Sequence, residues 1–137
     1  MEIHINYLAV LACGVASMFI GFLWYGPLFG RFWMSLMGFT EKNMNEAKAK
    51  GMGKTYAIAM AMSLLTAFIL AHFVSVWNAA SLQGAFEIAF WTWLGFYVTT
   101  AVNSVLWEGK SWKLYFLNIS NQFVTLFVNA LILVFWP

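Results

Sequence analysis

The chain has 137 residues, of which 63% are hydrophobic, 20% are aromatic and only 9% are charged. A soluble domain usually carries about 25% charged residues, so this composition excludes an ordinary water-soluble fold and predicts a protein of the lipid bilayer. The net charge of +2 comes from seven Lys and Arg residues confined to two hydrophilic gaps, a distribution that offers no basic surface for nucleic acid.

Four apolar runs reach the length of about 20 residues that the hydrocarbon core of a bilayer requires. They cover residues 5–25, 55–77, 82–107 and 112–135, and they leave a longer hydrophilic loop at 27–54. We therefore expect an all-α integral membrane protein, a four-helix transmembrane bundle that forms one membrane domain over residues 1–137. The short connections that join runs two, three and four favour antiparallel neighbours.

The basic residues predict the orientation. Arg31 and four lysines lie between runs one and two, and Lys110 and Lys113 lie between runs three and four. Because Lys and Arg are retained on the cytoplasmic side of a membrane, we expect both termini outside. The loop at 27–54 would then be cytoplasmic.

Run one ends at an aromatic corner. Pro27 has no backbone N–H and restricts the residue before it, while Trp24 and Tyr25 are typical of the headgroup level of a membrane. Residues 28–37 are too short to span the bilayer, so they predict an interfacial segment. Thr40, followed by an acidic residue, is typical of a capped start to a water-exposed helix.

Runs one and two carry small residues at every fourth position, which places those residues on one helix face. The positions are Ala9, Cys13, Ser17 and Gly21 in run one, and Ala59, Ser63, Ala67, Ala71 and Ser75 in run two. Small residues let helix backbones approach closely in lipid, so we expect packing strips and a homo-oligomer. The partner of each strip is either in the same subunit or in a neighbouring one.

Runs three and four carry polar side chains that match in depth on either side of their tight connection. The matched positions are Asn103 with Asn118, Thr99 and Thr100 with Asn121 and Gln122, and Thr92 with Asn129, and Thr125 extends the stripe of run four. An amide that faces lipid loses its hydrogen bonds, so these residues should face inward. This polar seam is either a set of interhelical hydrogen bonds or a hydrated path or small-solute site.

His72 and Glu87 come level with each other on either side of the connection between runs two and three. Ionisable groups at depth in a membrane are functional candidates, so this pair predicts a proton-responsive site that faces outside. The competing interpretation is a shallow pair whose side chains reach toward water. A metal site that also uses His4 would require three helices to converge, and we expect no metal.

Catalytic signatures are absent from the sequence. It contains no HExxH, phosphate-binding loop or CxxC motif, and it has no Asp at all. We therefore expect neither an enzyme nor a cofactor.

Several stretches resemble a known family. They are residues 22–30, Trp33 and Met34, residues 38–41, Asn103, residues 107–110, and Asn118. The chain is similar to small four-span proteins of the bacterial inner membrane known as domain of unknown function 1761. That resemblance implies the topology and an inner-membrane location but no established activity. Members of the family often carry a Tyr-His pair where this chain has Asn121 and Gln122.

The matching stretches suggest a cytoplasmic corner that joins the end of run one to the turn before run four. In this corner Arg31 or Lys110 would pair with Glu108, close to Trp24. The corner is either a binding site or a fold-defining turn. The functional expectation is a homo-oligomeric channel or transporter for an unknown small solute or ion, which would use the polar seam. The alternative is a non-catalytic membrane assembly module in which the seam is structural.

Overall fold

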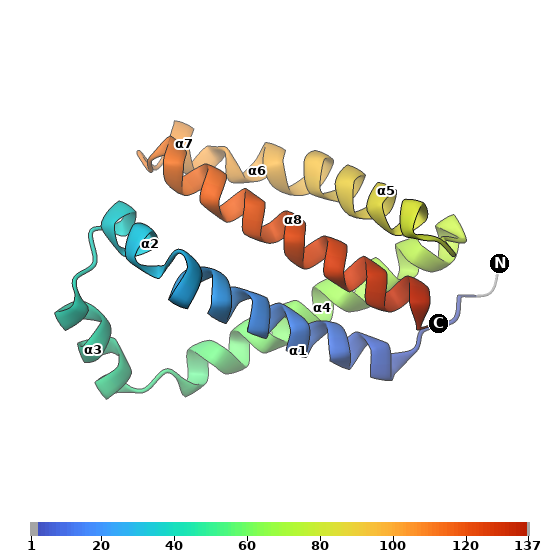
Figure 1. The fold of residues 1–137 in the computed structure, drawn as a ribbon, viewed down its shortest axis with the longest axis horizontal. Coiled ribbons are helices and arrows are strands. Elements are labelled where there is room, and N and C mark those ends of the chain that lie inside the picture. Colours follow the sequence, from blue (N-terminus) through green and yellow to red (C-terminus); the bar gives the residue numbers. More distant parts are fainter. Residues whose placement is uncertain (1–2, 137) are drawn as a thin grey trace.

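The computed structural model describes residues 3–136 and is helical, with no strand in that range (Figure 1). Its long α-helices are α1 (Tyr7–Leu23), α4 (Gly53–Trp77) and α8 (Trp112–Phe135). The shorter elements are the π-helices η1 (Trp24–Leu28) and η2 (Trp93–Val98) and the α-helices α2 (Gly30–Met37), α3 (Glu41–Lys50), α5 (Leu82–Thr92), α6 (Thr99–Ala101) and α7 (Asn103–Leu106).

Three helical stretches are long and apolar enough to cross a membrane, namely Tyr7–Leu28, Gly53–Trp77 and Trp112–Phe135. They coincide with apolar runs one, two and four of the sequence, within three residues at each end. The all-α class is therefore confirmed, and these helices are compatible with a membrane protein.

The third apolar run is not one continuous α-helix, which corrects the simple expectation for residues 82–107. The structure divides it into α5, η2, α6 and α7. Hydroxyls of Thr99 and Thr100 donate to the carbonyls of Gly95 and Phe96, each at 2.7 Å. Such back-bonding from Thr to the carbonyl four residues earlier is known to bend helices, and here it follows directly after the wide turn of η2.

Helix α8 occupies the centre of the bundle. It packs against α1 on one side and α5 on the other, while α4 contacts both α1 and α8 (Figure 1). The connection between α4 and α5 is tight because Asn78 adopts a left-handed conformation, with φ of 55°, and ends α4. Ser81 then caps α5 by accepting a hydrogen bond from the amide of Gly84 at 3.1 Å.

The core is built from small side chains and one close helix approach. Ala9, Cys13 and Ala67 are completely buried, so parts of both predicted small-residue strips do pack inside the bundle. Gly14 is a further small residue at the contact between α1 and α4. A Cβ atom on Gly14 would lie 2.6 Å from Cδ2 of Leu64, closer than van der Waals contact permits.

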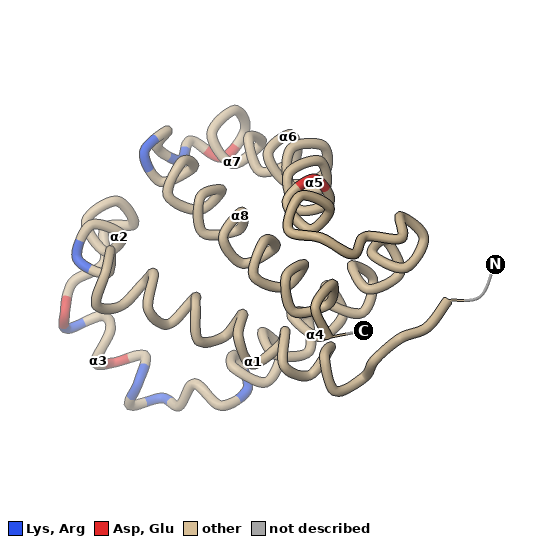
Figure 2. The backbone as a smooth tube through the Cα atoms, turned by 45° about the vertical axis from the view of Figure 1, so that its right-hand side comes forward, with Lys and Arg blue, Asp and Glu red and all other residues tan. Residues whose placement is uncertain are grey.

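The Lys and Arg residues gather at one end of the bundle, whereas Glu87 lies apart from them in α5 (Figure 2). Figure 2 shows Lys and Arg in α2, α3, the start of α4 and the turn between α7 and α8, whereas the N- and C-terminal ends lie at the opposite end (Figures 1 and 2). The two basic gaps therefore lie at the same end of the structure (Figure 2), and the membrane side that this end faces stays a prediction. We call this the basic end.

The predicted helix inside the loop is also confirmed. Thr40 caps α3, and its hydroxyl accepts a hydrogen bond from the amide of Asn43 while the Asn43 side chain accepts one from the amide of Thr40. This reciprocal pair satisfies amides that the first helical turn leaves open. Gly51, with φ of 91°, ends the helix.

Candidate functional site

The first of the two π-helical segments is η1, which contains Tyr25 and Pro27. Pro27 cannot donate a backbone hydrogen bond, so the regular helical pattern cannot continue through it. The turn widens instead, and the amide of Phe29 donates to the carbonyl of Trp24, five residues back, at 2.9 Å. The turn also requires a glycine at position 30, because a Cβ atom there would lie 2.9 Å from the carbonyl oxygen of Tyr25. The corner of run one is thus a π-turn that sets the direction of the Tyr25 side chain.

The second π-helical segment, η2, lies between α5 and α6 and contains Tyr97. Both of its ends are tied to α8 by aromatic donors. The indole N–H of Trp93 donates to the carbonyl of Ile119 at 2.7 Å, and the hydroxyl of Tyr115 donates to the carbonyl of Val98 at 2.8 Å. Single-turn π-helices occur frequently at functional sites, which makes the surroundings of both segments worth close inspection.

Side chains from the two π-segments meet on α8 and form what we call the tyrosine–asparagine cluster, made of Tyr25, Tyr97, Tyr115, Asn118 and Asn121. The hydroxyl of Tyr25 donates to Oδ1 of Asn118 at 2.7 Å. Asn121 lies beside the same hydroxyl, and Tyr97 is close enough to interact electrostatically with both Tyr25 and Tyr115. The cluster therefore joins span one, the third apolar run and α8.

One polar atom of the cluster is left open. Oδ1 of Asn121 is buried and has no hydrogen-bond partner among residues 3–136. A buried acceptor without a partner is destabilising by about 1–3 kcal/mol, and such groups in native structures require an explanation. An amide oxygen is an acceptor, so the partner it lacks is a hydrogen-bond donor.

A pocket of about 320 Å³ lies next to the cluster, between α4, η2 and α8. Tyr97 lines this pocket together with Gln122, Thr92 and Thr66, and the remaining walls are apolar. Tyr97 thus belongs to both the cluster and the pocket. The arrangement can hold a small molecule through hydrogen bonds, because it offers hydroxyl and amide groups but no charged side chain.

Within residues 3–136, the threonines of run three donate their hydrogen bonds inside their own helix and not to the amides of α8. The polar seam between runs three and four stays a prediction. Thr92 donates to the carbonyls of Ile88 and Ala89 at 2.6 and 3.2 Å, within its own helix. Thr99 and Thr100 do the same, as described above, and both are exposed. A threonine in a helix satisfies itself in this way, so it does not need a partner on the next helix.

Two amides of the polar stripe on α8, Asn118 and Asn129, face η1 and α1, whereas Gln122 lines the pocket with Thr92 and Tyr97 of the third apolar run. Asn129 is 1% exposed, and its Nδ2 donates to Oγ of Ser17 at 3.1 Å. Asn118 faces Tyr25 in the same direction. Thr125 is buried and donates to the carbonyl of Asn121 at 2.9 Å. Asn103, which was expected opposite Asn118, is exposed.

His72 and Glu87 each have a partner on their own helix. The Nδ1 atom of His72 lies 2.8 Å from the carbonyl of Phe68, and Glu87 accepts a hydrogen bond from Nε2 of Gln83 at 3.1 Å. Both side chains are partly buried. The proton-responsive pair therefore stays a prediction, and the structure gives each residue a local alternative to it.

The residues of the predicted cytoplasmic corner lie in separate parts of the structure. Trp24 donates from its indole to the carbonyl of Leu117 at 3.2 Å, so it anchors the corner to α8. Arg31 lines a pocket beside α3 that also contains Glu41 and Lys48. The remaining corner residues, Glu108 and Lys110, are exposed in the turn before α8.

Sequence reasoning missed the aromatic members of the site. Tyr97 and Tyr115 were not separated from the many aromatic residues that face lipid, although a hydroxyl that needs a partner was a usable signal. Ser17 was identified as a packing residue and not as the partner of an amide. Within residues 3–136 no group of three metal-ligating side chains occurs.

The comparisons with known proteins place most of the chain in one family. A family model described as a protein of unknown function (DUF1761) matches residues 8–134. No curated protein and no solved structure matches the chain.

Proposed function

The chain belongs to the DUF1761 family of proteins of unknown function, and we propose that it is a channel or transporter for a small neutral solute, with the tyrosine–asparagine cluster as its binding site. This proposal moves the functional site from the seam between the last two runs to the junction of span one, η2 and α8.

The observation that carries the proposal is the open Oδ1 atom of Asn121. It is a buried acceptor on a residue beside the hydroxyl of Tyr25, and Tyr97, which interacts with Tyr25, lines a pocket of about 320 Å³. A solute that donates a hydrogen bond would fill the vacant position. The cluster has no charged side chain, and an ion without a counter-charge is costly inside a membrane. A neutral donor such as water, ammonia, an alcohol or an amide therefore fits better than an ion.

The membrane arrangement is part of the same proposal. Residues 82–106 run back along α8 as a chain of helical segments, which supports a four-span topology (Figure 1). The basic end would face the cytoplasm of a bacterial cell, with both termini outside, because Lys and Arg are retained on that side. Exposed apolar residues along α4, such as Ile58, Met62 and Leu65, suit contact with lipid acyl chains, which are as apolar as these side chains.

A flux assay with matched variants tests the solute site. The full chain is reconstituted in liposomes, and uptake of urea, glycerol and ammonia is compared with uptake of Na⁺ and K⁺. We expect flux of at least one neutral solute above that of empty liposomes. Asn121→Leu should abolish this flux, whereas Asn103→Leu, at an exposed amide, should leave it intact. Equal flux in empty liposomes, or unchanged flux in Asn121→Leu, would overturn the proposal.

The second candidate is a non-catalytic assembly module, and a specific observation favours it. The bond between Asn129 and Ser17 joins two helices, and the threonines of run three bond within their own helices. Those polar groups therefore need no solute. If the protein transports nothing but forms a defined oligomer that Asn129→Ala dissociates, this second function is supported.

A further inference from the structure

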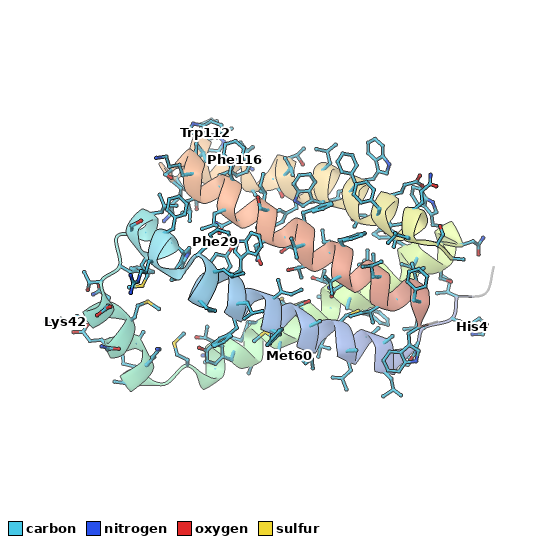
Figure 3. All side chains as sticks on the ribbon, viewed as in Figure 1. His4, Phe29, Lys42, Met60, Trp112 and Phe116 are labelled. Carbon is cyan, nitrogen blue, oxygen red and sulfur yellow. The ribbon has the colours of Figure 1, made fainter. Side chains whose placement is uncertain are left out.

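A second hollow lies at the basic end and is not part of the tyrosine–asparagine cluster. It has a volume of about 470 Å³ and lies between the η1–α2 corner and the first turns of α8. We call it the aromatic groove. Its walls include the side chains of Trp24, Phe29, Phe32 and Phe116, and among the described residues that line it Lys113 alone is charged. In Figure 3, Phe29 lies between the corner and α8, and Phe116 lies near the start of α8.

The groove has a polar and an apolar end along α8. Lys113 belongs to the first turn of the helix, at the basic end, and Ser120 lines the groove seven residues further on. Seven helical residues correspond to about 10 Å, so the groove descends from the charged surface into the apolar part of the bundle. Phe116, between these positions, is more than half exposed. This layout matches a molecule with an anionic head and a hydrocarbon chain.

We propose that the aromatic groove binds one anionic phospholipid from the leaflet at the basic end. Its phosphate would accept a hydrogen bond from the ammonium group of Lys113, and an acyl chain would lie along the rings of Phe29, Phe32 and Phe116. Charge complementarity selects this occupant, because cationic side chains near a membrane surface attract acidic headgroups. The inference depends on the membrane placement but not on the solute site.

The geometry also argues against other occupants. The indole N–H of Trp24 is already bonded to the carbonyl of Leu117, so it offers no further hydrogen bond to a polar solute. Trp24 and Phe29 contact each other, with ring centroids 4.9 Å apart, and form a continuous apolar wall. A wall of this kind fits a hydrocarbon chain, whereas free phosphate would use only the lysine.

Native mass spectrometry of the detergent-solubilised full chain tests this proposal. The protein is titrated with phosphatidylglycerol or with phosphatidylcholine of the same acyl chains. We expect one tightly retained phosphatidylglycerol, bound about fivefold more strongly than phosphatidylcholine, the preference expected of a single lysine near a phosphate. Lys113→Gln should remove this preference. Lys113→Arg should keep it and exclude misfolding as the cause of the loss.

The matched control is Lys110→Gln, which removes an equal charge three residues away, outside the groove. It should leave the preference unchanged, and Phe116→Ala should weaken binding of both lipids. Equal binding of the two lipids by the unaltered protein would overturn the proposal. It would also be overturned if Lys110→Gln removed the preference as completely as Lys113→Gln, or if Phe116→Ala dissociated an oligomer without affecting lipid binding. Displacement of bound phosphatidylglycerol by inorganic phosphate would also overturn the proposal, because the groove would then recognise phosphate without the acyl chain.

Discussion

The bond between Ser17 and Asn129 gives a quantitative test of how α1 and α8 are held together. Nδ2 of Asn129 donates to Oγ of Ser17 at 3.1 Å, and the Ser17 hydroxyl proton has its shorter bond, 2.8 Å, to the carbonyl of Cys13. One full interhelical hydrogen bond therefore joins the pair. Such bonds in membrane proteins contribute about 0.6 kcal/mol on average and up to about 1.7 kcal/mol. Because Asn129 is 1% exposed, we expect a coupling energy in the upper half of this range.

A double-mutant cycle with Ser17→Ala and Asn129→Ala measures this coupling. Unfolding is induced by SDS in mixed micelles and followed by tryptophan fluorescence. Asn129→Ala alone should cost more than the coupling, because it also leaves a cavity. The cycle of Thr92→Ala with Asn129→Ala should be additive. If the Ser17 cycle is additive within about 0.3 kcal/mol, the value typical of independent sites, the interhelical bond is refuted. Coupling to Thr92 instead would support the seam predicted from the sequence.

Three further substitutions test local features by the same unfolding assay. Gly14→Val should destabilise the protein by about 1–3 kcal/mol through overpacking against α4. Gly21→Val, whose Cβ meets no atom within 4 Å, should have little effect, and equal destabilisation by the two substitutions would refute the close approach. Gly30→Ala should be destabilising because its Cβ would lie 2.9 Å from a backbone carbonyl oxygen of η1, which cannot move aside. Gly26→Ala should be tolerated because the space around that position is open. An unchanged stability of Gly30→Ala would contradict the π-turn. Trp93→Phe should lower the stability by about 0.5–1.5 kcal/mol because the hydrogen bond to α8 is lost. An unchanged unfolding midpoint would show that this bond does not stabilise the protein.

Features that depend on composition and local chemistry were predictable. Hydrophobic run length located three of the long helices, because a bilayer-spanning helix needs a minimum apolar length. Thr40 and Gly51 located α3, because capping involves residues only a few positions apart. The position of the two basic gaps at one end followed from the alternation of helices. Each of these predictions requires no knowledge of which helices touch.

The sequence does not predict which surfaces of two helices pack against each other. Counting from a turn gives the depth of Thr92 and Asn129 but not the direction in which each side chain points. Asn118 and Asn129 are eleven residues apart, which is close to three full helical turns, so they share a face. Their partners, Tyr25 and Ser17, are each more than 90 residues away from them in the sequence. No local pattern in the sequence records that contact.

The two π-segments differ in what sustains them, and this difference bears on the site. Pro27 is a sufficient local cause for η1, since it removes a backbone donor. Segment η2 contains no proline, so its geometry requires tertiary support. That support comes from Trp93 and Tyr115, whose hydrogen bonds of 2.7 and 2.8 Å tie both ends of η2 to α8. Tyr97 lies between these two ties, so its backbone is held against α8 before a solute would enter the proposed site. A binding group held in this way loses little freedom on binding, which is the physical requirement for a preorganised site.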